Sequence, residues 1–167
     1  AKGFKFETET DTETVLHLVT LYLDEGKAPV DAARMALERL RGAFALGIIF
    51  AGNDDLMIGA RQGPPLAIGY GDGETYLGSD AIALAPFTDR ITSLEDGDWA
   101  VLSRKGVQIY DMQGRKISRP VIKSLASSLT APWPALTMLL AVPPLGDGVG
   151  NPQIGALLGG GGGLYGA

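Results

Sequence analysis

The chain has 167 residues, with 14 Lys or Arg against 19 Asp or Glu, so its formal net charge at pH 7 is −5. This acidic balance argues against a nucleic acid or an anionic membrane surface as the main partner, because both require clustered cations. The sequence contains no cysteine and one histidine, which excludes disulfides, cysteine nucleophiles and His-rich or thiolate metal sites. Because no signal peptide or spanning run is recognised, we expect a cytoplasmic protein.

Charge divides the chain into two parts. Residues 1–123 hold 32 of the 33 charged side chains, whereas residues 124–167 hold only Asp147. The second part also holds ten of the 24 glycines, five of them consecutive, and half of the ten prolines. Because ordering glycine is entropically costly, we expect little regular structure there. The interpretation is one domain over residues 1–123 and a low-charge Pro/Gly-rich tail of unknown origin over residues 124–167.

Two helices are predicted at the start of the chain. Thr10 and Glu13 have the T-x-x-E spacing of a capping box, which places a helix N-terminus near residue 10. Apolar residues then recur on one face as far as "EGK" at 25–27. A second helix is expected to begin near Pro29, because proline suits the first helical position, and to end at Gly42.

The next segments predict a sheet. Apolar runs separated by short turns such as "GNDD" and "GDG" indicate four antiparallel strands, over residues 43–50, 55–61, 65–71 and 74–80. A short helix is expected from Ser79, and "DWAVLS" and "GVQIYD" predict two further strands followed by a "DMQGRK" hairpin turn. Two helices on a largely antiparallel sheet make an α+β layer.

The order of these segments carries a family resemblance. "GFKFETETDTETVLHLV", "LRGAFALGIIF", "ARQGPPLAIGYGDGETYLGSDAIAL" and "LEDGDWAVLSRKGVQIYD" together resemble the second half of the glutaminase domain of glucosamine-6-phosphate synthases, the glutamine:fructose-6-phosphate aminotransferases. The resemblance covers about residues 1–123. It implies a class II amidotransferase and part of the Ntn-hydrolase fold, a four-layer αββα sandwich. In this family the acid of "ETDTE" holds the α-amino group of glutamine, so the expected substrate-binding residues are Asp11 and its neighbour Thr10.

The family's chemistry needs groups that these residues do not provide. The family's nucleophile is an amino-terminal Cys, whereas residue 1 here is Ala, and the "RWATHG" clamp and the "HNG" oxyanion donor belong to the first half of the domain, which the resemblance does not include. The isomerase domains have no counterpart in these residues either. Without nucleophile and oxyanion hole, acyl transfer loses its largest contributions. We therefore expect a truncated amidotransferase fragment that keeps part of a pocket for glutamine or glutamate, uses no cofactor, and does not hydrolyse glutamine alone.

Carboxylate chemistry is an alternative. Glu9, Asp11 and Glu13 could supply the pair of acids that cleaves a glycosidic bond without Cys or His, which would make the chain a hydrolase of new type acting on a glycoside. The simpler interpretation of Glu9 and Glu13 is a helix N-terminus, where the dipole favours acids. A non-catalytic interaction module is the third hypothesis, so the sequence leaves open whether the chain is an enzyme.

Other candidates have structural explanations. His17 falls between apolar helical positions, so a packed or surface histidine is favoured over a catalytic base. The acids of "GNDDL" and "GDGE" are typical of turns, and no metal site is predicted.

The segment "FALGIIF" is continuously apolar, which is typical of a strand buried on both faces. If part of the sandwich is missing, an apolar face needs another cover. The tail could provide it, but its glycines and prolines make it costly to order, so a homodimer is favoured.

Overall fold

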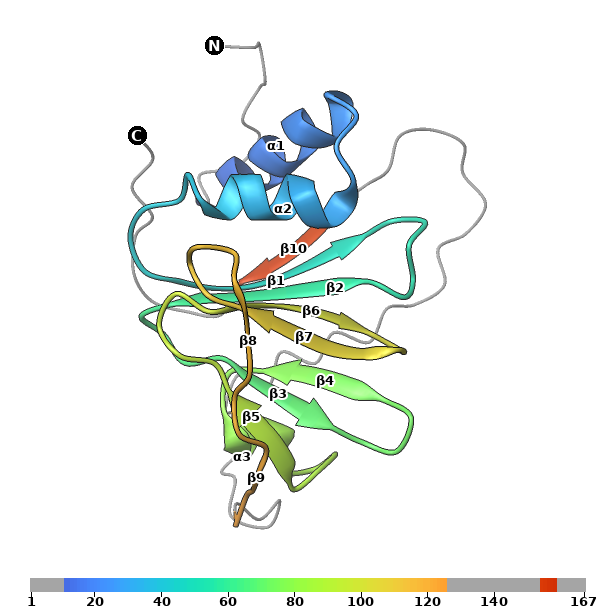
Figure 1. Cartoon of the computed structure of the whole chain (residues 1–167), viewed down its shortest axis with the longest axis vertical. Coiled ribbons are helices and arrows are strands. Elements are labelled where there is room, and N and C mark those ends of the chain that lie inside the picture. Colours follow the sequence, from blue (N-terminus) through green and yellow to red (C-terminus); the bar gives the residue numbers. More distant parts are fainter. Residues whose placement is uncertain (1–10, 126–153, 159–167) are drawn as a thin grey trace.

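The computed structural model describes residues 11–125 and 154–158, which form the predicted α+β structure, with the strands divided between two antiparallel sheets. Figure 1 shows helices α1 and α2 on one face of the larger sheet, the smaller sheet on its other face, and the short helix α3 beyond it. The layers therefore follow the order helix, sheet, sheet, helix.

Helix α1 (Asp11–Asp24) begins and ends close to the predicted positions. Gly26, at φ 81°, ends it, with its N–H donating to the Leu23 carbonyl and the Lys27 N–H to the Tyr22 carbonyl. This is the Schellman arrangement, which glycine favours because it adopts a positive φ without strain.

Of the helices in the described ranges, none has the length and apolar character needed to cross a membrane.

Helix α2 (Pro29–Leu37) begins at the predicted proline but ends before Gly42. The last turn tightens, because the Arg39 and Leu40 N–H groups bond to carbonyls only three residues earlier. Arg41 Nη1 then donates to the carbonyls of residues 38 and 40, at 2.9 Å each. The predicted extension to Gly42 is therefore wrong, since residues 38–41 instead turn the chain into the first strand.

The larger sheet has the order β10-β1-β2-β6-β7-β8. Its members are β1 (Phe44–Phe50), β2 (Met57–Gln62), β6 (Trp99–Ser103), β7 (Gly106–Tyr110), β8 (Lys116–Ile117) and β10 (Ile154–Leu158). The hairpins β1–β2 and β6–β7 were predicted. Pairing of β2 with β6 joins the two hairpins into one sheet.

The smaller sheet has the order β4-β3-β5-β9. It comprises β3 (Ala67–Tyr70), β4 (Thr75–Gly78), β5 (Arg90–Ser93) and β9 (Ile122–Lys123), and α3 (Ala81–Leu84) packs against β4 and β5. Asp80, rather than the predicted Ser79, caps α3 by accepting from the Ala83 N–H.

Strands β5, β9 and β10 were not predicted. The chain changes sheets between β2 and β3, so the four predicted strands do not all pair consecutively.

Three apolar clusters lie between the layers. The first joins α1 and α2 to the larger sheet through residues such as Val19, Leu46 and Ile48. The second lies between the sheets and includes Ala45 and Ile68, and the third lies under α3. Residues of β1 belong to both of the first two clusters, as its continuous apolar sequence predicted. Its faces are covered within the chain, and the uncovered face expected from the sequence is not found at this strand.

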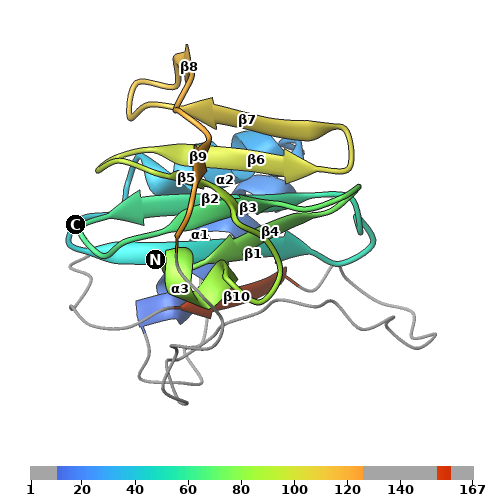
Figure 2. The same ribbon diagram turned by 90° about the horizontal axis from the view of Figure 1, so that it is seen from below.

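One strand comes from the tail. Strand β10 lies antiparallel to β1 at the edge of the larger sheet, where α1 contacts it (Figure 2). The rest of the tail beyond residue 125 lies outside the described residues, so the expectation of an irregular tail concerns residues that the structure does not describe.

Candidate functional site

The predicted site lies at the beginning of α1. Glu9 and Thr10 are outside the described residues, so the capping box remains a prediction. Asp11 is the first residue of α1, and its side chain is also outside the described part. Its backbone position is at a helix N-terminus, where free N–H groups make the local potential positive and stabilise a carboxylate.

Glu13 is the one acid of this group whose side chain is described. It is 8% exposed, and its Oε1 lies 3.3 Å from Nε2 of His17, one helical turn later. The prediction that His17 is a packed or surface residue agrees with its contact with Glu13 and with the 20% of its side chain that is exposed. Glu13 is thus engaged with an imidazole on its own helix, which gives no support to a carboxylate pair acting on a glycoside.

The acids of the two predicted turns also have structural partners. Asp55 accepts a hydrogen bond from the Arg104 N–H at 2.6 Å, which ties the β1–β2 turn to the β6–β7 turn. Glu74 accepts from the Tyr76 hydroxyl, and this bond raises the pKa of Tyr76. Within residues 11–125 and 154–158, no three His, Cys, Asp or Glu side chains form a group that could hold a metal ion.

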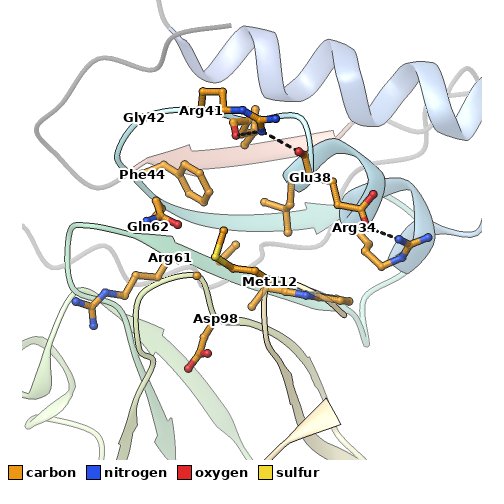
Figure 3. A pocket seen from close by; sticks show the side chains of 14 residues that line it. Arg34, Glu38, Arg41, Gly42, Phe44, Arg61, Gln62, Asp98 and Met112 are labelled. Carbon is orange, nitrogen blue, oxygen red and sulfur yellow. Dashed lines mark hydrogen bonds and ion pairs between the residues drawn. The ribbon is translucent and has the colours of Figure 1, made fainter. Parts of the chain in front are cut away.

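A cavity of about 500 Å³ opens elsewhere, where the end of α2, the start of β1, the end of β2 and the loop before β6 meet (Figure 3). It is lined by Arg34, Leu37, Glu38, Leu40, Arg41, Gly42, Phe44, Ala60, Arg61, Gln62, Gly97, Asp98, Trp99 and Met112. None of the site residues predicted from the sequence, Glu9, Thr10, Asp11 and Glu13, lines this cavity. The segments that form it are far apart in the chain, so no local motif marks it.

The cavity has an apolar wall held in a fixed orientation. Leu40, Ala60 and Trp99 are all buried. Trp99 stacks on Tyr110 with ring centroids 4.4 Å apart, and its Nε1 donates to the Asp111 carbonyl at 3.1 Å. Both contacts hold the indole in one rotamer, so this wall is pre-formed.

The charged groups of the cavity already have partners. Arg34 pairs with Glu38, and Arg61 donates to the carbonyls of Leu94 and Gly63, with its guanidinium directed away from Met112 in Figure 3. Asp98 accepts from Arg119, which lies outside the cavity lining. No nucleophile stands beside a base among the lining residues, so the cavity shows no catalytic arrangement.

Comparison with known proteins identifies the relatives of the chain, although no protein-family model matches it. The chain is 66% identical over 124 residues to the glutamine–fructose-6-phosphate aminotransferase [isomerizing] of Brucella abortus. It is 66% identical over 126 residues to the enzyme of the same name from Bradyrhizobium diazoefficiens, and 60% identical over 126 residues to that of Mesorhizobium japonicum. These matches cover 74–75% of the chain but only 20–21% of each relative. The chain therefore spans about a fifth of the length of the curated relatives it matches, which fits a fragment and confirms the resemblance seen in the sequence.

Proposed function

We propose that the chain is the second half of a glutaminase domain from a glutamine-dependent amidotransferase. The observation that carries this proposal is the 66% identity over 124 residues to a glutamine–fructose-6-phosphate aminotransferase. The helix, sheet, sheet, helix order of the layers supports assignment to the Ntn-hydrolase fold. Because the match covers about a fifth of the relatives, the proposal concerns the handling of glutamine alone.

The proposed ligand contact is between Asp11 and the α-amino group of glutamine. Asp11 occupies the third position of "ETDTE", and α1 begins at this residue. An ammonium group and a carboxylate make a charge-assisted hydrogen bond, which is stronger than a bond between neutral groups. Thr10 precedes Asp11 and is proposed to lie in the same pocket.

We also propose that these residues bind glutamine without hydrolysing it. The 167 residues contain no thiol, so no acyl-enzyme can form on a cysteine. A cytoplasmic location and a homodimer belong to this proposal as expectations that follow from the sequence.

Calorimetry on the full chain tests the proposal. We expect glutamine to bind the unmodified chain, and Asp11→Asn to weaken binding at least tenfold. Asp24→Asn is the matched control, since it removes an acid at the other end of the same helix. An ammonia-release assay should show no turnover for any of the three proteins. Equal affinity in Asp11→Asn, or turnover that follows the chain through repurification, would contradict the proposal.

A further inference from the structure

Strand β1 lies directly inside the edge strand β10, and its sequence differs from those of β8, β4 and β9, which form the other edges of the two sheets. Strands β8 and β9 have two residues each and carry a lysine, and β4 has four residues. Short or charged strands are how proteins prevent unwanted pairing at a sheet edge. Strand β1 has seven residues and no charge, so its sequence lacks these protections.

The burial of β1 is that of an interior strand. Leu46 and Ile48 are at most 1% exposed and pack in the cluster under the helices. On the opposite face, Ala45 is 6% exposed and packs between the sheets, and Gly47 and Ile49 are half-buried. Backbone groups of a strand that is covered in this way have little access to water, so they need hydrogen-bond partners along both edges.

Only one edge of β1 has a local partner. Strand β2 pairs with it from Phe44↔Gln62 to Ile49↔Met57 and is joined to it by a short turn. The other edge pairs with β10, from Leu46↔Leu158 to Phe50↔Ile154. Strand β10 comes from the low-charge tail, about a hundred residues along the chain from its partner, and its sequence "IGALL" contains only small and aliphatic residues.

We infer that the outer edge of β1 is a strand-acceptor site for an uncharged strand of small and aliphatic residues, paired antiparallel. Residues 154–158 are an exchangeable occupant of this site, and a strand of the same chemistry from another polypeptide can replace them. Such strand addition obtains its affinity from backbone hydrogen bonds and its selectivity from alternate side chains. The inference concerns a protein partner and does not depend on glutamine binding.

The competition between the two occupants sets the design of the test. A tethered segment has an effective concentration of about millimolar order, so a free peptide competes poorly with the intact tail. Weakening β10 by proline substitution removes this advantage, because proline cannot donate a hydrogen bond to the neighbouring strand. Successive residues of a strand direct their N–H groups to opposite sides, so only one of residues 155 and 156 donates toward β1. Gly155→Pro and Ala156→Pro are therefore made as separate variants.

Hydrogen exchange of residues 44–50 in the full chain is the measurement. We expect at least one of the two proline variants to exchange these amides tenfold or more faster, while Gly161→Pro, three residues beyond β10, leaves them unchanged. A peptide with the sequence of residues 152–160 should restore protection, and the same peptide carrying the proline substitution of the faster-exchanging variant should not. Unchanged exchange in both variants, or no effect of the unmodified peptide, would overturn the inference.

A second measurement covers the case in which the proline variants fail to fold. The same peptide, carrying a photo-crosslinking group in place of the leucine equivalent to Leu157, is added to the unmodified chain in excess over the effective concentration of the tethered tail, which is of about millimolar order. Because Leu157 pairs with Gly47, crosslinks should fall within residues 44–50. Crosslinks elsewhere, or none above those of the proline-bearing peptide, would show that this edge does not accept a strand in trans.

Discussion

Asp98 and Arg119 form a two-point ion pair where the chain passes from one sheet to the other. Arg119 Nε donates to Asp98 Oδ2 at 2.8 Å, and Nη2 donates to Oδ1 at 3.0 Å. Asp98 is 2% exposed and also accepts from the Glu95 N–H at 2.8 Å. The hydrogen bond to Asp98 raises the pKa of Arg119. Because Arg119 lies in the connection between β8 and β9, the pair fixes that connection against the loop before β6.

Arg119→Met should destabilise the chain strongly. The variant leaves the Asp98 carboxylate buried with no cation, which costs about 3–5 kcal/mol when one partner of a buried pair is removed. Arg115→Met is the control, because its ion pair with Asp111 has a 74% exposed arginine and exposed pairs contribute about 0–1 kcal/mol. Urea unfolding of both variants provides the comparison. Equal losses in the free energy of unfolding for the two variants would show that backbone donors alone stabilise the buried Asp98 carboxylate.

Gly59→Ala should cost more than Gly47→Ala, although the two glycines face each other across β1 and β2. A Cβ at Gly59 would lie 2.9 Å from Leu77 Cδ1, whereas one at Gly47 would lie 3.3 Å from Leu77 Cδ2. Overpacking usually costs about 1–3 kcal/mol, and the cost here should lie toward the lower end because the contacted atoms are the end of the flexible Leu77 side chain. Truncating Leu77 to alanine should reduce the penalty of Gly59→Ala in a double-mutant cycle. Strictly additive free energies of unfolding would show that Leu77 is not the obstacle.

The β7–β8 turn should stabilise the chain in a pH-dependent way. Burial acts to raise the pKa of Asp111, but hydrogen bonds and charge from Arg115, with a further bond from the Gln113 N–H, lower it overall. A pKa below the unfolded value of about 3.9 means that the stabilisation is present above that pH and is lost as pH falls through the folded pKa. Asp111→Asn should therefore lower the urea midpoint at pH 7.

The same variant should differ less from the unmodified chain near pH 3, where the unfolded carboxyl is mostly protonated. Asp72→Asn, at an exposed turn position, is the control and should change neither midpoint appreciably. A deficit of the same size for Asp111→Asn at both pH values would mean that its charge does not matter.

If Asp11 holds an ammonium group, ligands without one should bind poorly. We expect N-acetylglutamine to bind at least tenfold more weakly than glutamine, which corresponds to about 1.4 kcal/mol. The difference should disappear in Asp11→Asn, because the partner of the ammonium is then neutral. Calorimetry with both ligands on both proteins forms the test, and equal affinity of the two ligands for the unmodified chain would place the α-amino group elsewhere.

Elements with strong local signals were predictable from the sequence. Helix α1 ends at a glycine that its Schellman turn requires, and β6 and β7 are apolar segments on either side of a tight turn. Strand β5 was missed because it has four residues, "RITS", of which Thr92 is fully buried. Its hydroxyl donates to the Pro120 carbonyl at 3.1 Å and accepts from Tyr70, partners that lie far away in the sequence.

The site was less predictable than the fold. The position of Asp11 came from a family resemblance, and propensity alone would have given it a capping role. The cavity was missed because Arg34, Arg61 and Trp99 converge only after α2 has packed on the larger sheet. Glu13 is likewise buried only because α1 packs against other elements, and a capping motif in the sequence does not predict that burial.

The order of synthesis gives the β10–β1 pairing a kinetic consequence. A ribosome adds about 5–20 residues per second, so β1 emerges roughly 5–20 s before the strand that covers its outer edge. Its neighbour β2 follows almost at once, and the hairpin forms within microseconds. Throughout the interval an uncharged strand edge is open to other nascent chains, as in the early stages of aggregation. Production in cells should therefore depend more on chaperones that shield exposed strands than the stability of the finished fold would suggest.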